Sequence, residues 1–131
     1  MKKKKWGRIC HISSIAALEN QGPPSYCAAK SAINSYVRSL NESLRNYNIS
    51  ITSIMPGPIF TKGGYWEQVK KHRPSHLKKF IKERVAINRL GNISEISQLV
   101  NFLCSNQAQI LSGECFLADG GQGRSFYPLE F

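Results

Sequence analysis

A helical pattern between two short apolar runs constrains the fold of this chain more than any other feature of its sequence. Residues 8–12 and 49–55 are short, apolar and rich in β-branched side chains, as buried strands are. Pro23 and Pro24 favour a helix start, and apolar side chains recur at helical spacing from about residue 24 to about residue 47. Two strands that are joined by such a crossover helix run parallel. The predicted core-facing stripe of the helix consists of Tyr26, Ala29, Ile33, Tyr36, Val37, Leu40, Leu44 and Tyr47.

The second half of the sequence continues the alternation of helices and strands. Residues 62–91 form an irregular insert, for which we predict two short helices separated by Pro74. Asn92 and Glu95 have the spacing of a capping box, which predicts that a further helix begins there. Residues 114–118 predict a last strand. The expected fold is therefore α/β, with three parallel strands and flanking helices in a single domain over residues 1–131.

Length and composition limit the classes of protein that the sequence fits. A chain of 131 residues, 41% of them hydrophobic, can bury one core. There is no apolar run of the roughly 20 residues that a membrane span needs, and the lysines after Met1 do not begin a signal peptide. The expected location is cytoplasmic. The four cysteines are widely spaced, which predicts reduced thiols rather than disulfides or a zinc site.

Two histidines have the spacing of metal ligands on a helix. His72 and His76 are four residues apart, but Pro74 lies between them and interrupts a continuous helix. No carboxylate is well placed beside them. We therefore predict no metal site.

Tyr26 and Lys30 are the candidate chemical groups. Residues four apart lie on one face of a helix, and an ammonium group held near a phenol favours the phenolate. Such a tyrosine exchanges a proton with a substrate oxygen near neutral pH. Ser13 and Ser14 end the first predicted strand, at the edge of an open parallel sheet where ligands bind. This equipment interconverts an alcohol and a carbonyl if another group carries the hydride. The alternative is that Tyr26 is a core ring beside a solvated lysine.

Five motifs occur in the order and at the distances typical of one family. They are Ile12-Ser13-Ser14, Tyr26-Cys27-Ala28-Ala29-Lys30, Pro56-Gly57-Pro58-Ile59-Phe60-Thr61, Arg89-Leu90-Gly91 and Asp119-Gly120-Gly121. Together they resemble the second half of a short-chain dehydrogenase/reductase, and the resemblance covers nearly all of the chain. It implies a partial Rossmann fold, the C-terminal half of a doubly wound sheet, without the N-terminal dinucleotide-binding half.

The resemblance also implies an activity and a site. The activity is that of an NAD(P)-dependent oxidoreductase on a small-molecule alcohol/carbonyl pair. Ser14, Tyr26 and Lys30 are the implied catalytic residues, with Tyr26 as the acid/base. Residues 62–91 match the substrate loop and its lid. The stretches Asn20–Ser25 and Gly121–Tyr127 resemble those of bacterial relatives associated with surface-sugar biosynthesis, which implies a sugar derivative as substrate. The nicotinamide end of NAD or NADP is expected to contact Tyr26, Lys30, Pro56, Gly57, Ile59 and Thr61.

Two departures from the family pattern affect these expectations. The spacing from Ser14 to Tyr26 is one residue shorter than usual, so counting back from Tyr26 selects Ser13, whereas the Ile-Ser-Ser motif selects Ser14. We favour Ser14, because a loop absorbs a deletion and a strand end does not. The glycine-rich phosphate loop, Gly-x-x-x-Gly-x-Gly, does not occur in the sequence. Nucleotide binding by this chain alone is therefore doubtful, and we expect Met1 to correspond to an internal position of a longer ancestral chain.

Two other functions fit the sequence less directly. The first is a non-catalytic remnant or subunit that associates with a full-length relative, because an uncovered sheet edge predicts self-association or marginal stability. A homo-oligomer is expected on the same ground. The second is nucleic-acid binding, suggested by the net charge of +10 but not by any recognised motif. The aromatic tail, with Phe126, Tyr127 and Phe131, is expected to pack on a surface or a partner subunit.

Overall fold

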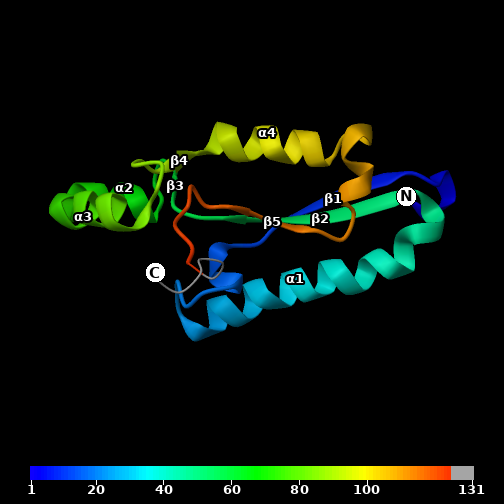
Figure 1. Cartoon of the computed structure of the whole chain (residues 1–131), viewed down its shortest axis with the longest axis horizontal. Coiled ribbons are helices and arrows are strands. Elements are labelled where there is room, and N and C mark those ends of the chain that lie inside the picture. Colours follow the sequence, from blue (N-terminus) through cyan, green and yellow to red (C-terminus); the bar gives the residue numbers. More distant parts are fainter. Residues whose placement is uncertain (125–131) are drawn as a thin grey trace, which may run out of the picture.

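The computed structural model describes residues 1–124 and has a parallel sheet at its centre. The sheet has the order β1-β2-β5, formed by Gly7–Ile12, Ile49–Pro56 and Cys115–Ala118. Helix α1 (Pro24–Leu44) covers one face and helix α4 (Ile93–Leu103) covers the other (Figure 1). The predicted α/β fold, with parallel strands and flanking helices, is confirmed. The expected packing of Phe126, Tyr127 and Phe131 lies outside the described residues.

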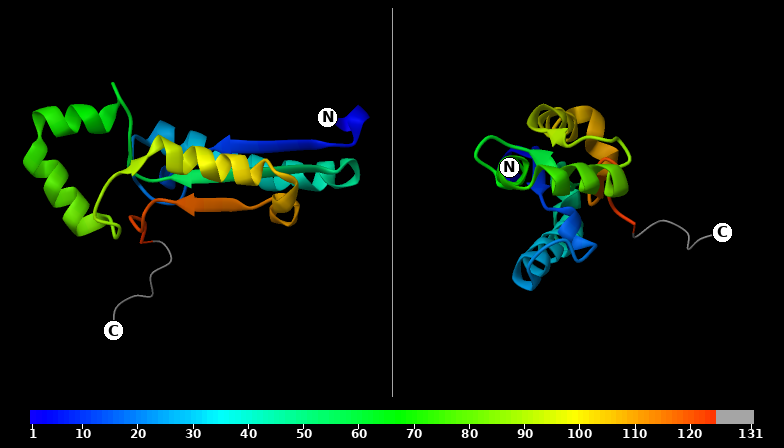
Figure 2. Two further views of the ribbon diagram at one scale, coloured as in Figure 1. Left: turned by 90° about the horizontal axis from the view of Figure 1, so that it is seen from above. Right: turned by 90° about the vertical axis from the view of Figure 1, so that its left-hand side faces the viewer.

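The central strand, β2, carries most of the core. Its residues 49–55 are all buried, because the two helical layers cover both of its faces. On the α1 side, Ile49 and Ile51 pack with Val37 and Leu44. On the α4 side, Ile54 packs with Leu103 and Ala108. The three strands run in the same direction and end at one edge of the sheet, next to the 62–91 insert (Figures 1 and 2).

Helix α1 has the predicted extent but a narrower buried stripe than predicted. It begins at Pro24, and a 3-10 turn (Arg45–Tyr47) continues it to Asn48, whose positive φ ends the helix. Val37 and Leu44 are buried, and Ile33, Leu40 and Tyr47 pack against the core. The prediction was wrong for three residues, because a stripe this wide exceeds what three strands cover. Those residues are Ala29, which is exposed, Tyr26 (43% exposed) and Tyr36 (54% exposed).

The insert contains the two predicted helices and one element that was not predicted. Helix α2 (Tyr65–His72) ends just before Pro74, which begins helix α3 (Pro74–Arg84), so His72 and His76 belong to different helices. Strands β3 (Ile59–Phe60) and β4 (Gly91–Asn92) pair in parallel at the base of the insert. Strands of two residues are too short to leave a periodic pattern in the sequence. This pairing brings the two ends of the insert together.

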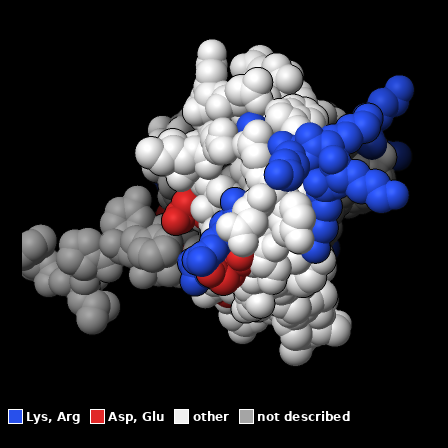
Figure 3. All heavy atoms as spheres, turned by 90° about the vertical axis from the view of Figure 1, so that its right-hand side faces the viewer, with Lys and Arg blue, Asp and Glu red and all other residues white. Residues whose placement is uncertain are grey.

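The positive charge is divided between two ends of the molecule. Lys2–Lys4 form a 3-10 turn at the amino end of the sheet, and Lys5 follows it. Figure 3 shows Lys and Arg side chains gathered on one side of that end. The exposed lysines of α2 and α3 lie at the opposite end (Figure 1). Burial raises the pKa of the Cys10 and Cys115 thiols, and all four cysteines are free. In residues 1–124, no helix is long and apolar enough to cross a membrane.

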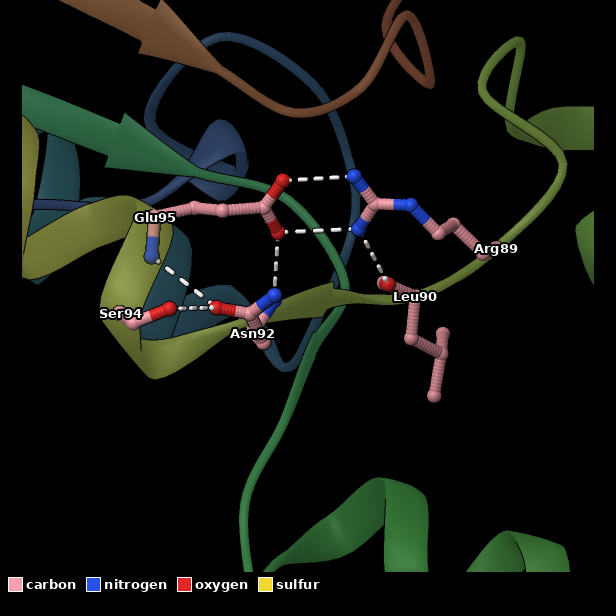
Figure 4. A network of polar contacts seen from close by, with 5 residues as sticks. All are labelled: Arg89, Leu90, Asn92, Ser94 and Glu95. Carbon is pink, nitrogen blue, oxygen red and sulfur yellow. Dashed lines mark hydrogen bonds and ion pairs between the residues drawn. The ribbon is translucent and has the colours of Figure 1, made fainter.

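A polar network fixes the start of helix α4. The Asn92 side chain accepts a hydrogen bond from the backbone N–H of Glu95, and the Glu95 carboxylate accepts one from the backbone N–H of Asn92, as the capping box predicts. The Arg89 guanidinium binds both oxygens of the same carboxylate, at 2.9 and 2.6 Å (Figure 4). The end of the insert is therefore tied to the first turn of α4.

This network predicts a dependence of stability on pH. The hydrogen bond from Arg89, followed by that from the Asn92 backbone, lowers the pKa of Glu95 from 4.5 to about 2. Because the pKa of Glu95 is lowered in the folded state, the contribution of its ionised carboxylate to the free energy of unfolding is complete above about pH 4.5. This contribution is lost as the pH falls to about 2. A carbon-13 NMR titration of the Glu95 carboxyl group should show its midpoint near 2, and Arg89→Met should move it back towards 4.5. A midpoint near 4.5 in the unaltered chain would contradict this.

Candidate active site

A cavity of about 580 Å³ lies at the carboxyl edge of the sheet. One wall comes from the segment after β1, the start of α1 and the end of β2, and the other comes from α2 and α3. No Lys, Arg, Asp or Glu belongs to its described lining. The lining residues are Ser14, Ile15, Gln21, Gly22, Pro23, Tyr26, Gly57, Pro58, Tyr65, Trp66, His76, Phe80 and Gln122.

The two serines after β1 face different surroundings. The Ser13 backbone N–H continues the ladder by donating to the Ile54 carbonyl, and its hydroxyl, which is buried, donates to the Lys30 carbonyl at 2.9 Å. Since side chains of extended residues alternate in direction, Ser14 points the other way and lines the cavity. The Ser14 hydroxyl accepts a hydrogen bond from the Ala16 N–H at 3.1 Å. Its own hydrogen donates to no atom of residues 1–124 and is available to a ligand.

Tyr26 stands in the first turns of α1 with its ring on the cavity. Its hydroxyl makes no hydrogen bond to any described residue. The Lys30 ammonium lies over the Tyr26 ring, 5.6 Å from its centroid, and donates to the Ile12 carbonyl at 2.9 Å. The loop at Gly22 lies close against the Tyr26 ring, and a Cβ at this position would come within 3.1 Å of the ring. The pair is not a core ring beside a solvated lysine, since Tyr26 is partly exposed and lines a cavity.

The residues expected at the nicotinamide are only partly gathered here. Gly57 lines the large cavity, and a Cβ on it would meet the backbone of Asp119 at 2.7 Å, so the end of β2 packs directly on that of β5. Ile59 lines a smaller neighbouring cavity of about 280 Å³. Pro56, Thr61 and Lys30 line neither of the two. The Thr61 carbonyl accepts from the Gly64 N–H at the start of the insert.

The opposite wall of the cavity was missing from the predicted site. It contains Tyr65, Trp66, His76 and Phe80, all from the insert. Gln21 and Gln122, from two loops outside the insert, also line the cavity and were not among the predicted site residues. Trp66 stacks on Phe80 with ring centroids 4.7 Å apart, and Tyr65 meets Trp66 edge-on at 5.1 Å. The family resemblance implies a lid over residues 62–91, but it does not specify which faces of the two helices turn towards the sheet. The two glutamines lie in motif neighbourhoods that the sequence did single out.

The arrangement can bind and protonate a small uncharged molecule. A phenol and a serine hydroxyl, both free to donate, share one wall of a cavity at the edge where ligands of open α/β sheets bind. The space beside Tyr26 and Gly57 can accept a nicotinamide ring, and the Lys30 ammonium has hydrogens left to donate. These residues fit the nicotinamide end of a nucleotide. The pyrophosphate end has no glycine-rich loop in the sequence to receive it.

Comparisons with known proteins give one consistent family. A family model described as Enoyl-(Acyl carrier protein) reductase matches residues 1–122. A 3-oxoacyl-[acyl-carrier-protein] reductase of Aquifex aeolicus (strain VF5) is 30% identical over 122 residues, which are 92% of this chain and 47% of that protein. An acetoacetyl-CoA reductase of Shinella zoogloeoides is 32% identical over 93% of this chain and 49% of its own length. The chain therefore spans about half the length of the curated relatives it matches.

A solved structure repeats the fold over nearly the whole chain. The L-sorbose reductase from Gluconobacter frateurii, complexed with NADPH and L-sorbose, superposes with a TM-score of 0.83 at 26% identity. The match covers 93% of this chain and 49% of that one.

Proposed function

This chain belongs to the short-chain dehydrogenase/reductase family, and from that membership we propose that it acts as an NAD(P)-dependent oxidoreductase on an alcohol/carbonyl pair. The observation that carries the proposal is the cavity in which Ser14 and Tyr26 share a wall, with their hydroxyl hydrogens free of partners in residues 1–124. The substrate proposed is a small molecule, a sugar derivative. The 62–91 insert is proposed as the lid over it.

The chain's own residues perform the proton transfer. In the reducing direction, the Tyr26 hydroxyl donates its proton to the substrate oxygen, while the Ser14 hydroxyl holds that oxygen by a second hydrogen bond. The Lys30 ammonium, over the Tyr26 ring, stabilises the negative charge that develops on the phenolic oxygen. The insert covers the cavity and excludes water during the reaction.

The nicotinamide nucleotide, when bound, supplies or accepts the hydride. Its nicotinamide end is proposed to lie beside Tyr26, Lys30 and the segment with Pro56, Gly57, Ile59 and Thr61. The purified chain, titrated with NADH and with NADPH, should enhance the fluorescence of at least one of the two. If neither nucleotide binds at any accessible concentration, the chain has no reductase activity of its own.

The two serines should respond differently to substitution. Ser14→Ala removes a hydrogen bond to the reacting oxygen and is expected to lower kcat by roughly 10- to 100-fold, since a bond to developing charge contributes about 1.5–3 kcal/mol. Ser13→Ala removes the bond to the Lys30 carbonyl and should lower the free energy of unfolding by about 1 kcal/mol with little change in kcat. Initial rates and urea denaturation of both variants test this. A larger rate loss for Ser13→Ala would identify Ser13 as the catalytic serine.

A second candidate function is that of a subunit that associates with a full-length relative. Strand β1 pairs on one side only among the described residues. Its last residue, Ile12, is 44% exposed, and Tyr36, which meets the ring of His11 in this strand, is 54% exposed. An unpaired strand edge with apolar side chains favours association. Sedimentation of the chain, alone and with a full-length relative, tests this proposal. A monomeric chain that melts cooperatively and does not bind the full-length relative would overturn this proposal. The same result would overturn the proposed homo-oligomer.

A further inference from the structure

Three side chains form a hydrogen-bonded row that ends at the cavity. The Gln21 amide nitrogen donates to the Glu19 carboxylate at 3.0 Å, and the Gln122 amide nitrogen donates to the Gln21 amide oxygen at 3.0 Å. The other oxygen of Glu19 accepts from the backbone N–H of Arg124. Gln21 and Gln122 both line the cavity, and Gln122 is only 5% exposed.

The carboxylate sets the direction of the whole row. A carboxylate only accepts hydrogen bonds, so the Gln21 amide must turn its nitrogen to Glu19 and its oxygen away. That oxygen in turn requires the nitrogen of Gln122. The amide oxygen of Gln122 is thereby left over, and no donor in residues 1–124 reaches it. A largely buried amide therefore presents an acceptor, and its second N–H, to the cavity.

The turn that carries Gln122 is itself fixed. The buried Asp119 carboxylate accepts from the N–H groups of Gly121 and Gly123, at 2.9 and 2.6 Å, on either side of Gln122. The Gln122 N–H donates to the Asp119 carbonyl. Because its backbone and one end of its amide are held, Gln122 loses little conformational freedom when a ligand binds.

The rest of the cavity indicates what kind of ligand suits this amide. The charged side chains of the insert do not line it, although the net charge of the chain is +10. The wall from the insert is aromatic, with Tyr65, Trp66 and Phe80 in ring contact. A hydroxyl group both donates and accepts, which matches a free amide oxygen beside a free N–H. A ring that carries hydroxyl groups also has C–H surface to pack on aromatic side chains.

We propose that Gln122, oriented by Gln21 and Glu19, is a specificity-determining residue that binds a hydroxyl group of an uncharged polyhydroxylated carbonyl compound. This inference rests on the proposed reductase function and adds the residue that selects its substrate. Gln122 contacts the substrate away from the reacting carbon. Glu19 and Gln21 are positioning residues. A substrate that lacks this hydroxyl group binds less well, because it leaves the largely buried Gln122 amide without a hydrogen-bond partner.

The test compares two uncharged ketones by NMR, without any nucleotide. L-sorbose carries hydroxyl groups and cyclohexanone carries none. In nitrogen-15 spectra of the full chain, L-sorbose should shift the side-chain amide signal of Gln122, and cyclohexanone should not. Gln122→Met keeps the size of the side chain and removes its polar atoms. It should raise the Kd for L-sorbose about tenfold and leave that for cyclohexanone unchanged.

Two further variants keep the result interpretable. Glu19→Gln lets the amide groups of Gln21 and Gln122 exchange the positions of their oxygen and nitrogen atoms. It should therefore also raise the Kd for L-sorbose, by a few-fold. Gln98→Met, on an exposed position of α4, is the matched control and should change neither Kd. Unchanged backbone signals show that each variant is folded.

The outcomes separate this inference from the proposed function. If L-sorbose does not bind, or binds equally well to Gln122→Met, the inference is wrong, whatever the reductase assay gives. If L-sorbose binds through Gln122 and no hydride transfer occurs with either nucleotide, the substrate class stands and the reductase function fails. Equal turnover of both ketones, insensitive to Gln122, would leave the reductase function intact and overturn the inference.

Discussion

Replacing Tyr26 with phenylalanine is expected to lower kcat by roughly 10²- to 10⁴-fold, the usual contribution of a positioned proton donor. The ring keeps its place against Gly22 and under the Lys30 ammonium, so the cavity retains its shape. Only the hydroxyl that protonates the substrate oxygen is lost. The KM and the free energy of unfolding should change little, because this hydroxyl makes no hydrogen bond within residues 1–124. Initial rates at saturating substrate, with urea denaturation of the same samples, measure both quantities.

Tyr36 provides the matched control for this substitution. It lies on the same helix, is partly exposed and meets the ring of His11 edge-on with centroids 5.8 Å apart. It does not line the cavity. Tyr36→Phe should therefore leave kcat unchanged. A loss of rate as large as that of Tyr26→Phe would show that the effect arises from the helix rather than from the reacting oxygen.

Ile54→Ala is expected to lower the free energy of unfolding by about 2–5 kcal/mol, the range for large-to-small changes in packed cores. Ile54 has no exposed surface and lies in the central strand against Leu103 and Ala108. Truncation leaves a cavity between β2 and α4, which neighbours on both sides of a parallel sheet cannot fill by a small shift. The midpoint of urea denaturation should fall accordingly.

An exposed isoleucine offers the corresponding control. Ile110 is 90% exposed, so Ile110→Ala removes the same atoms without opening a core cavity. Its effect should stay within about 0.5 kcal/mol. If the two variants lose similar stability, β2 does not lie between the two helical layers as described.

The parts of the fold that the sequence predicted are those fixed by local chemistry. Pro24 begins α1 and Pro74 begins α3, because proline is tolerated only in the first turn of a helix. Asn92 and Glu95 form the predicted capping box. The β-branched run over residues 49–55 becomes a strand buried on both faces. Each of these signals acts within a few residues, so no knowledge of the tertiary structure is needed.

The features of the fold that the sequence did not predict depend on contacts between distant segments. The exposure of Tyr26, Ala29 and Tyr36 follows from the width of the sheet, which helical spacing does not report. The pairing of β3 with β4 joins residues on either side of the insert.

The sequence predicted only part of the candidate site. The motifs located Ser14, Tyr26 and Lys30, and their catalytic roles stay predictions. The motif favoured Ser14 over Ser13, and the register of β1 supports that prediction, because the Ser13 hydroxyl is turned towards the Lys30 carbonyl. The aromatic wall brings together side chains of α2 and α3, and the row from Glu19 to Gln122 joins residues 101 positions apart. No local pattern specifies either contact.

We propose nicotinamide-dependent carbonyl reduction in the cavity beside Ser14 and Tyr26, and a labelled hydride tests this most sharply. The most direct measurement is to incubate the purified chain with L-sorbose and NADH or NADPH labelled with deuterium on either face of nicotinamide C4. The product is then analysed by mass spectrometry. We expect one deuterium on the carbinol carbon of the alcohol from one of the labelled faces, and none with Tyr26→Phe over the same period. A nucleotide that binds while no label reaches the sugar, from either face, would contradict the claim.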